Sequence, residues 1–149
     1  MSEIPGVPCV FCEIVAGRAP AHRVDENEEA LAILDTQPFA AGHTLVLSKR
    51  HVQWWDDLTE NEAAAVFALA HRVAKRLKAA FDPELVTLYA RGRRIPHTHV
   101  FLVPTSKGDV LDRHFDELEK IQETSEDLAP LRRPASREEA ARRIRRRPR

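Results

Sequence analysis

Short runs of alternating apolar and polar residues in the first hundred positions predict an antiparallel sheet. Apolar residues lie on both sides of the turn-rich cluster DENE, which is typical of a β-hairpin within residues 22–35. The alternation in HTLVLSK predicts a third strand over residues 43–49. Two more strands are predicted in ELVTLYARG and HTHVFLVP, residues 84–92 and 97–104, with a short basic loop at 91–94 between them.

A helical period replaces the alternation in LTENEAAAVFALAHRVAKRLKAAF, residues 58–81. Thr59 and Glu62 have the spacing of a capping box at its start, and Asp82-Pro83 ends it. A shorter helix is predicted from Cys12 to Ala16. The pattern therefore predicts an α+β fold, with an antiparallel sheet of about five strands and one long helix.

The last forty residues follow a different pattern and divide the chain. Residues 1–108 are expected to form the main domain. In VLDRHFDELEKIQ, four apolar residues share one helical face, so residues 109–131 should contain a helix that packs on the body or on a partner. Those four residues are Leu111, Phe115, Leu118 and Ile121. Residues 132–149 have too few apolar side chains to fold alone and are expected to be a flexible basic tail.

Composition narrows the class of protein. A chain of 149 residues is long enough to bury one real core. It has no apolar run long enough to span a membrane and no signal-peptide pattern, so we expect a cytoplasmic protein without a membrane partner. Two cysteines are too few for a secreted disulfide scaffold, which leaves metal, redox or inert roles for them.

The net charge of zero conceals a basic end. Residues 132–149 contain nine arginines and two glutamates, a net charge of +7 against −7 for the rest of the chain. Such a tail can bind nucleic acid through phosphates, with affinity that falls steeply with salt. It contains no aromatic residue for base stacking, so nucleic-acid binding is a weaker alternative to a solvated tail or one docked on the acidic body.

The pair Cys9 and Cys12, in CVFC, has the spacing at which two thiolates hold one zinc ion. A redox pair would be expected in a thioredoxin-like context, which this stretch lacks. Zinc needs two further ligands, and spacing alone does not choose them. The candidates are His22, His43, His51, His71, His97, His99 and His114. On a strand, His97 and His99 point to the same face, and Phe101 occupies the next position of that face.

These residues carry a family resemblance. The stretch CVFCEIVAGRAPAHRVDENEEALAILDTQPFAAGHTLVLSKRHV resembles the N-terminal half of histidine triad (HIT) proteins, and PHTHVFLVP resembles their signature of alternating histidines. The resemblance covers about residues 7–104 and includes the elements LD, GHTLV and KRHV in the family's order. It implies a HIT-like fold that is commonly a homodimer, with the helix from Thr59 in the interface.

The bacterial zinc-binding branch of this family implies a specific ligand set. Carried over by motif, the structural zinc would be held by Cys9, Cys12, His51 and His97. Four protein ligands leave no open position on the ion, so this zinc would brace the fold and would not bind substrate.

The resemblance also implies a function. His99 corresponds to the family's nucleophile, which attacks the α-phosphorus of a nucleotide and forms a nucleotidyl-histidine that water or an acceptor then resolves. The implied activity is that of a hydrolase or nucleotidyltransferase acting on a purine nucleotide, a nucleoside phosphoramidate or a dinucleotide. The implied nucleotide site consists of Phe11, Ile14, Ile33 and Leu34 around the base, Asp35 at the ribose hydroxyls, and Arg93 at the phosphate.

The sequence departs from the family at the third triad position. Phe101 stands where most members have histidine, and a phenylalanine has no hydrogen-bonding group for the phosphoryl oxygens. Loss of one such donor costs about 3–4 kcal/mol of activation free energy. Arg91, Arg93 and Arg94 replace the family's usual phosphate contacts and can act as clamps or as solvated loop residues. The alternative function is therefore a catalytically impaired nucleotide-binding or interaction module with a structural zinc.

Overall fold

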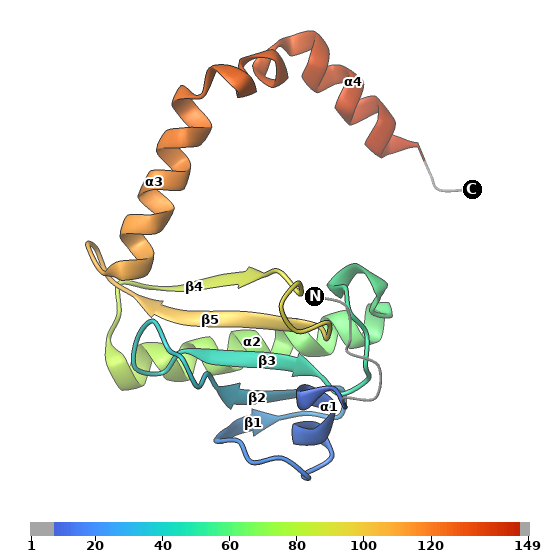
Figure 1. Ribbon diagram of the computed structural model, residues 1–149, viewed down its shortest axis with the longest axis vertical. Helices are drawn as coiled ribbons and strands as arrows, with labels where there is room; N and C mark the ends of the chain where they lie inside the picture. The colour runs from blue at the N-terminus through green and yellow to red at the C-terminus, as the bar shows by residue number, and fades with distance from the viewer. Residues whose placement is uncertain (1–7, 147–149) are drawn as a thin grey trace. The chain divides into compact units, whose positions relative to one another are not determined.

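The structure is a computed structural model that describes residues 8–146 and divides into two compact units between Asp109 and Val110. The first unit contains a five-stranded antiparallel sheet in the order β1-β2-β3-β5-β4 (Figure 1). Its strands are β1 (Arg23–Glu26), β2 (Ala30–Leu34), β3 (Thr44–Ser48), β4 (Leu85–Ala90) and β5 (His99–Thr105). Its helices are α1 (Val10–Val15), the 3-10 helix η1 (Trp55–Asp57) and α2 (Glu60–Phe81). The predicted α+β class and the five strands are confirmed.

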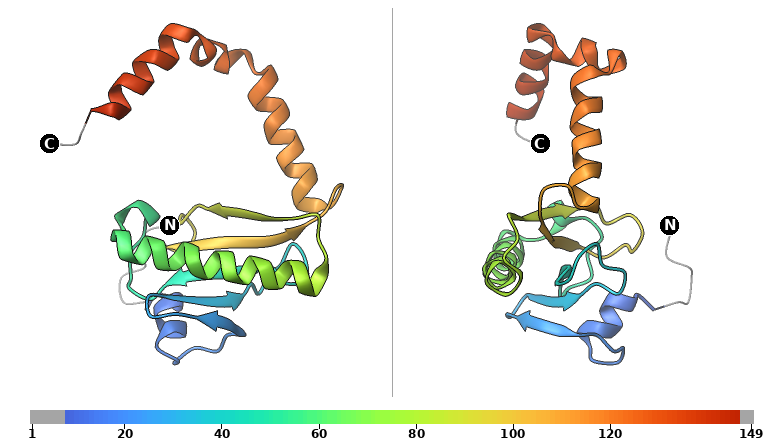
Figure 2. Two further views of the ribbon diagram at one scale, coloured as in Figure 1. Left: turned by 180° about the vertical axis from the view of Figure 1, so that it is seen from behind. Right: turned by 90° about the vertical axis from the view of Figure 1, so that its left-hand side faces the viewer.

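The sheet has two faces with different coverings. Figure 2 shows α2 running across one face, where alternate residues of the strands, such as Val46 and Leu102, pack against the apolar stripe of α2 that includes Leu69 and Val73. On the other face, Phe11 and Ile14 of α1 pack with a second cluster built on β2 and β3. The period-2 alternation of the strands therefore separates a purely structural layer from the face that carries the site.

Helix α2 has the predicted boundaries. The Thr59 hydroxyl accepts a hydrogen bond from the backbone N–H of Glu62, and the Glu62 carboxylate accepts one from the N–H of Thr59, so the capping box is complete. The helix ends at Asp82, whose left-handed backbone (φ 46°) closes the last turn ahead of Pro83.

The histidine strand starts later than predicted. Residues 97–104 were expected to be extended, but β5 begins at His99, and the His97 N–H instead donates to the carbonyl oxygen of Ile95. Pro96 has no N–H with which to extend the ladder, and the chain bends before it joins the sheet. The short helix also begins two residues before its predicted start, at Val10.

The second unit consists of α3 (Val110–Thr124), the 3-10 helix η2 (Glu126–Arg132) and α4 (Pro134–Arg145). The helix predicted within residues 109–131 is present as α3, and two residues of its apolar face, Leu118 and Ile121, are exposed. The basic tail is helical over α4, while its mobility and its partners stay predictions. In the described part of the chain, 8–146, no helix has the length and apolar content to cross a membrane.

Candidate functional site

Four residues predicted as metal ligands meet at one end of the sheet. Cys9 precedes α1 and Cys12 lies within it, while His51 follows β3 and His97 precedes β5. Their ligand atoms all lie within 4.8 Å of one another. The fold thus brings together residues separated by up to 88 positions in the sequence.

The distances between these atoms suit a tetrahedral zinc ion. The Nδ1 atoms of His51 and His97 are 3.3 Å apart, and Cys12 Sγ lies 3.2 Å from His51 Nδ1 and 3.5 Å from His97 Nδ1. Cys9 Sγ lies 3.4 Å from His97 Nδ1. Zinc bonds of about 2.0 Å to nitrogen and about 2.3 Å to sulfur, at tetrahedral angles, separate two nitrogens by about 3.3 Å and nitrogen from sulfur by about 3.5 Å. The residues present therefore fit this ion.

The protonation of His97 is suited to a ligand. Its Nε2 donates a hydrogen bond to the carbonyl oxygen of Ser48 at 2.7 Å, so Nε2 carries the proton and the lone pair of Nδ1 faces the cysteines. Burial lowers the pKa of His97, which keeps the ring neutral. An N–H to carbonyl bond on the far nitrogen is the usual way a protein fixes a ligating histidine.

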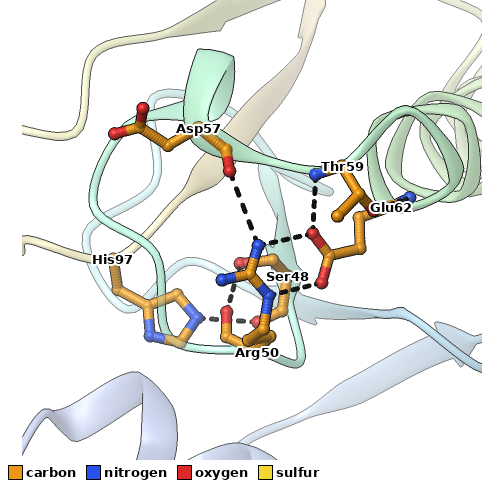
Figure 3. A network of polar contacts seen from close by, with 6 residues as sticks. All are labelled: Ser48, Arg50, Asp57, Thr59, Glu62 and His97. Atoms are coloured by element: carbon orange, nitrogen blue, oxygen red, sulfur yellow. Dashed lines mark hydrogen bonds and ion pairs between the residues drawn. The ribbon is translucent and has the colours of Figure 1, made fainter.

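A hydrogen-bond network adjoins the four predicted metal ligands through His97 and Ser48 (Figure 3). The Ser48 hydroxyl donates to the carbonyl oxygen of Arg50, and the Arg50 guanidinium donates to both carboxylate oxygens of Glu62 at 2.6 and 2.7 Å. These hydrogen bonds, with that from the Thr59 N–H, lower the pKa of Glu62 to about 2. The network ties the segment that carries His51 to the start of α2.

His99, the predicted nucleophile, is buried and oriented. Its Nδ1 donates to the carbonyl oxygen of His97 at 2.6 Å, so its Nε2 holds the lone pair. Burial lowers the pKa of His99, partly opposed by that hydrogen bond and by the charge of Asp35. The ring of Phe11 lies edge-on to both His99 and His97, with centroids 5.1 and 5.8 Å away. A neutral imidazole with its lone pair on Nε2 is a competent nucleophile.

The other predicted nucleotide residues fall into two groups. Phe11, Ile14 and Ile33 are buried in the apolar cluster on the His99 face of the sheet. Leu34 is 38% exposed, and Asp35 is partly exposed beyond the end of β2. Arg93 is exposed in the loop between β4 and β5. A small pocket beside His99 is lined by Gln53, Trp54, Trp55, Ala90, Arg91, Gly92 and Thr98.

Phe101 lies in an aromatic row that the sequence did not reveal. Its ring stacks on Tyr89 at 4.5 Å between centroids and stands edge-on to His99 at 4.8 Å. On another side, His43 lies 5.8 Å from Phe101 and stacks on Phe39. Tyr89 was not among the predicted site residues. The alternating pattern of β4 indicates only which face of the sheet Tyr89 lies on. That Tyr89 pairs with Phe101 depends on the register between β4 and β5.

His43 is a third buried histidine, after His97 and His99. Its Nδ1 accepts a hydrogen bond from the Phe39 N–H, so its Nε2 carries the proton and faces Asp35 at 3.5 Å. Burial lowers its pKa, against the opposing effect of the Asp35 charge. His43 is 2% exposed, and its two ring nitrogens face groups of its own segment, Phe39 and Asp35.

Comparison with known proteins identifies a family and several relatives of this chain. The family model described as "HIT domain" matches residues 16–108. An uncharacterized HIT-like protein of Mycobacterium tuberculosis is 38% identical over 110 residues, 70% of this chain and 76% of that protein. The adenylylsulfatase HINT3 of Arabidopsis thaliana is 30% identical over 108 residues, 69% of this chain and 55% of that protein.

Two solved structures bear on the site. A Zn-bound histidine triad family protein from Mycobacterium smegmatis superimposes with a TM-score of 0.64 at 29% identity, covering 75% of this chain and 96% of that one. A hypothetical histidine triad nucleotide-binding protein from Sulfolobus tokodaii superimposes with a TM-score of 0.62 at 32% identity, covering 68% and 71%.

Proposed function

Since this chain belongs to the HIT family, we propose that it binds a purine nucleotide conjugate and cleaves it through a nucleotidyl-histidine intermediate on His99. The reaction would be that of a nucleoside phosphoramidate or dinucleotide hydrolase, or of a nucleotidyltransferase. The hydrogen bond from His99 Nδ1 to the carbonyl oxygen of His97 carries the proposal, because it leaves the Nε2 lone pair available. The names of the Sulfolobus and Arabidopsis relatives support nucleotide binding and hydrolysis.

The chemistry follows from that lone pair. His99 Nε2 forms a bond to the α-phosphorus, and the bond from phosphorus to the leaving group breaks with its electron pair. The leaving group takes up a proton from water. In the second half-reaction, water or another acceptor attacks phosphorus and releases His99 as a neutral imidazole. Because burial already favours the neutral ring, no deprotonation of His99 is needed near pH 7.

The substrate would lie along the apolar face around His99. Phe11, Ile14, Ile33 and Leu34 would contact the base, and the Asp35 carboxylate would accept hydrogen bonds from the ribose hydroxyls. Arg93 lies in the loop that precedes the histidines and would pair with phosphate oxygens.

Cys9, Cys12, His51 and His97 would hold a structural zinc ion. Two thiolates neutralise the ion and four protein ligands close its shell, so the chemistry it supplies is a cross-link between α1 and the histidine segment. The fit of the distances between the four ligand atoms to tetrahedral zinc and the Zn-bound relative from M. smegmatis support this assignment.

Two copies of the chain would associate through α2. Phe67 and Phe81 are 45% and 48% exposed, and both lie on one side of this helix, fourteen residues apart. The exposed rings of Phe67 and Phe81 would supply apolar area to this interface.

A second candidate function is a nucleotide-binding module without turnover. The observation that favours it is Phe101, which replaces a polar partner for the phosphoryl group with an apolar ring. Both candidates bind the same ligand, so the difference between them is chemical and not structural.

The test is detection of the intermediate. The purified protein is mixed with adenosine and guanosine phosphoramidates and dinucleotides, and intact mass and product are followed. His99→Ala removes the nucleophile, and His114→Ala, at an exposed position of α3, is the matched control. A nucleotide-sized adduct in the wild type and in His114→Ala, absent in His99→Ala, is the expected result. Nucleotide binding with neither adduct nor product would instead establish the second candidate.

A further inference from the structure

The aromatic row next to His99 contains one side chain with a hydroxyl group, Tyr89. Tyr89 of β4 is the direct cross-strand partner of Phe101 of β5, so both side chains leave the sheet on the same face. Their rings stack at 4.5 Å with an interplanar angle of 16°, and Phe101 in turn meets His99 edge-on at 4.8 Å. The order along the face is therefore His99, Phe101, Tyr89.

Each member of this row has a different capacity. Phe101 occupies the third histidine position and offers no hydrogen-bonding group. Tyr89 brings a phenol to the next position, and a phenol is a hydrogen-bond donor. Burial and the charge of Asp35 raise the pKa of Tyr89, so the hydroxyl keeps its proton at neutral pH. Tyr89 is partly exposed, and a bound molecule can therefore reach it.

Other polar groups near the row are less suited to this role. His43 lies against Phe101, but it is 2% exposed, its Nδ1 accepts from Phe39, and its Nε2 faces Asp35. The Thr98 side chain is 1% exposed, whereas that of Tyr89 is partly exposed.

We propose that the Tyr89 hydroxyl replaces the third histidine, donating a hydrogen bond to a phosphoryl oxygen as His99 attacks. This inference rests on the proposed function. Tyr89 stays protonated throughout: the bond from His99 Nε2 to phosphorus forms, the leaving-group bond breaks, and the hydroxyl stabilises the negative charge that develops on oxygen. Phe101 positions Tyr89 by stacking and makes no polar contact itself.

Tyr89→Phe is the direct test, because it deletes one oxygen and keeps the stacked ring. The rate of nucleotidyl-His99 formation in a single turnover should fall by about 100- to 1000-fold, the usual effect of removing one preorganised donor. The nucleotide Kd should change by less than about threefold, because the hydrogen bond strengthens only in the transition state. Thr87→Val is the matched control: it deletes a hydroxyl from the same strand, whose contact is with Thr105, and should leave the rate unchanged.

Rescue separates a chemical role from a structural one. In a Tyr89→Phe background, Phe101→His restores a donor at the third triad position and should raise the rate of nucleotidyl-His99 formation at least about tenfold. In the wild-type background the same substitution should raise that rate much less, because the Tyr89 hydroxyl already donates the hydrogen bond.

The two proposals fail in different ways. Wild-type protein that forms the adduct while Tyr89→Phe forms it equally fast would overturn the role of Tyr89 and leave the proposed function standing. A slow Tyr89→Phe that Phe101→His does not rescue would also overturn it, since the defect would then be structural. Wild-type protein that forms no adduct would overturn both.

Discussion

Removal of the proposed zinc should unfold α1 before the sheet and should strongly lower the melting temperature of the protein. The reason lies in α1, which has six residues and no side-chain hydrogen bond at its N-cap. A helix this short is not stable alone, because nucleation costs more than one turn of hydrogen bonds returns. Burial of Phe11 and Ile14 contributes about 1.5–3 kcal/mol each, and the metal would supply the remaining attachment.

The size of the effect follows from the positions of the ligands. An ion that joins Cys9 to His97 connects residues 88 positions apart. A cross-link over a loop of that length destabilises the unfolded chain by about 4.5 kcal/mol at 25 °C in the chain-entropy model. For a unit of this size, each kcal/mol shifts Tm by about 4 °C, so removal of the ion should lower Tm by about 15–20 °C.

The assay combines thermal unfolding with elemental analysis and hydrogen exchange. Protein as purified should contain one zinc per chain, and a strong chelator should remove it with the stated fall in Tm. Protection should be lost first at the amides of Glu13 and Ala16, which donate to the carbonyl oxygens of Cys9 and Cys12. Cys9→Ser/Cys12→Ser should melt near the chelated wild type and show no response to chelator, because the chain has no other cysteines.

The bracing role would be refuted by a wild-type protein whose zinc falls from one to zero while Tm moves by less than about 3 °C, under 1 kcal/mol. A chelator response that persists in Cys9→Ser/Cys12→Ser would place the metal elsewhere in the chain.

Two further predictions concern α2. The pKa of Glu62, about 2 in the folded protein against an ordinary 4.5, is depressed mainly by Arg50, so its contribution to stability is present above about pH 4.5 and is lost as pH falls toward 2. Glu62→Gln should therefore have a lower free energy of unfolding in urea at pH 7, and that free energy should fall less steeply between pH 4.5 and 2 than in the wild type. An equal slope in the two proteins would contradict this. Phe67→Glu should convert a dimer into a monomer in sedimentation velocity, whereas Ala68→Glu, an exposed neighbour on a different side of the helix, should not; a Phe67→Glu dimer would exclude this face.

The elements governed by local chemistry could be predicted from the sequence. The capping box of Thr59 and Glu62, the hairpin around DENE and the strand after His43 are encoded within a few residues each, and the structure has them. The start of β5 was predicted two residues early, because alternation alone does not register the effect of Pro96.

The site depends on contacts that local patterns do not encode. The spacing of Cys9 and Cys12 indicates that they share a metal ion, but spacing does not distinguish His51 and His97 from the other five histidines. The Tyr89–Phe101 stack depends on the register between β4 and β5, which the turn geometry of the intervening loop sets. The network from His97 through Ser48 and Arg50 to Glu62 likewise joins residues that are neighbours only after folding.

His97 links the proposed metal site to the proposed chemistry through two different atoms of one residue. Its imidazole offers Nδ1 to the cysteines, while its own carbonyl oxygen accepts the proton of His99 Nδ1 at 2.6 Å. A shift of the His97 peptide would therefore weaken the bond that fixes the tautomer of His99, and a neutral imidazole without that bond distributes its proton between both nitrogens. Since Ser48 and the proposed zinc hold the two ring nitrogens of His97, they hold the nucleophile's orientation as well. A metal with no open coordination position and no contact with substrate would in this way still determine how much of His99 is ready to react.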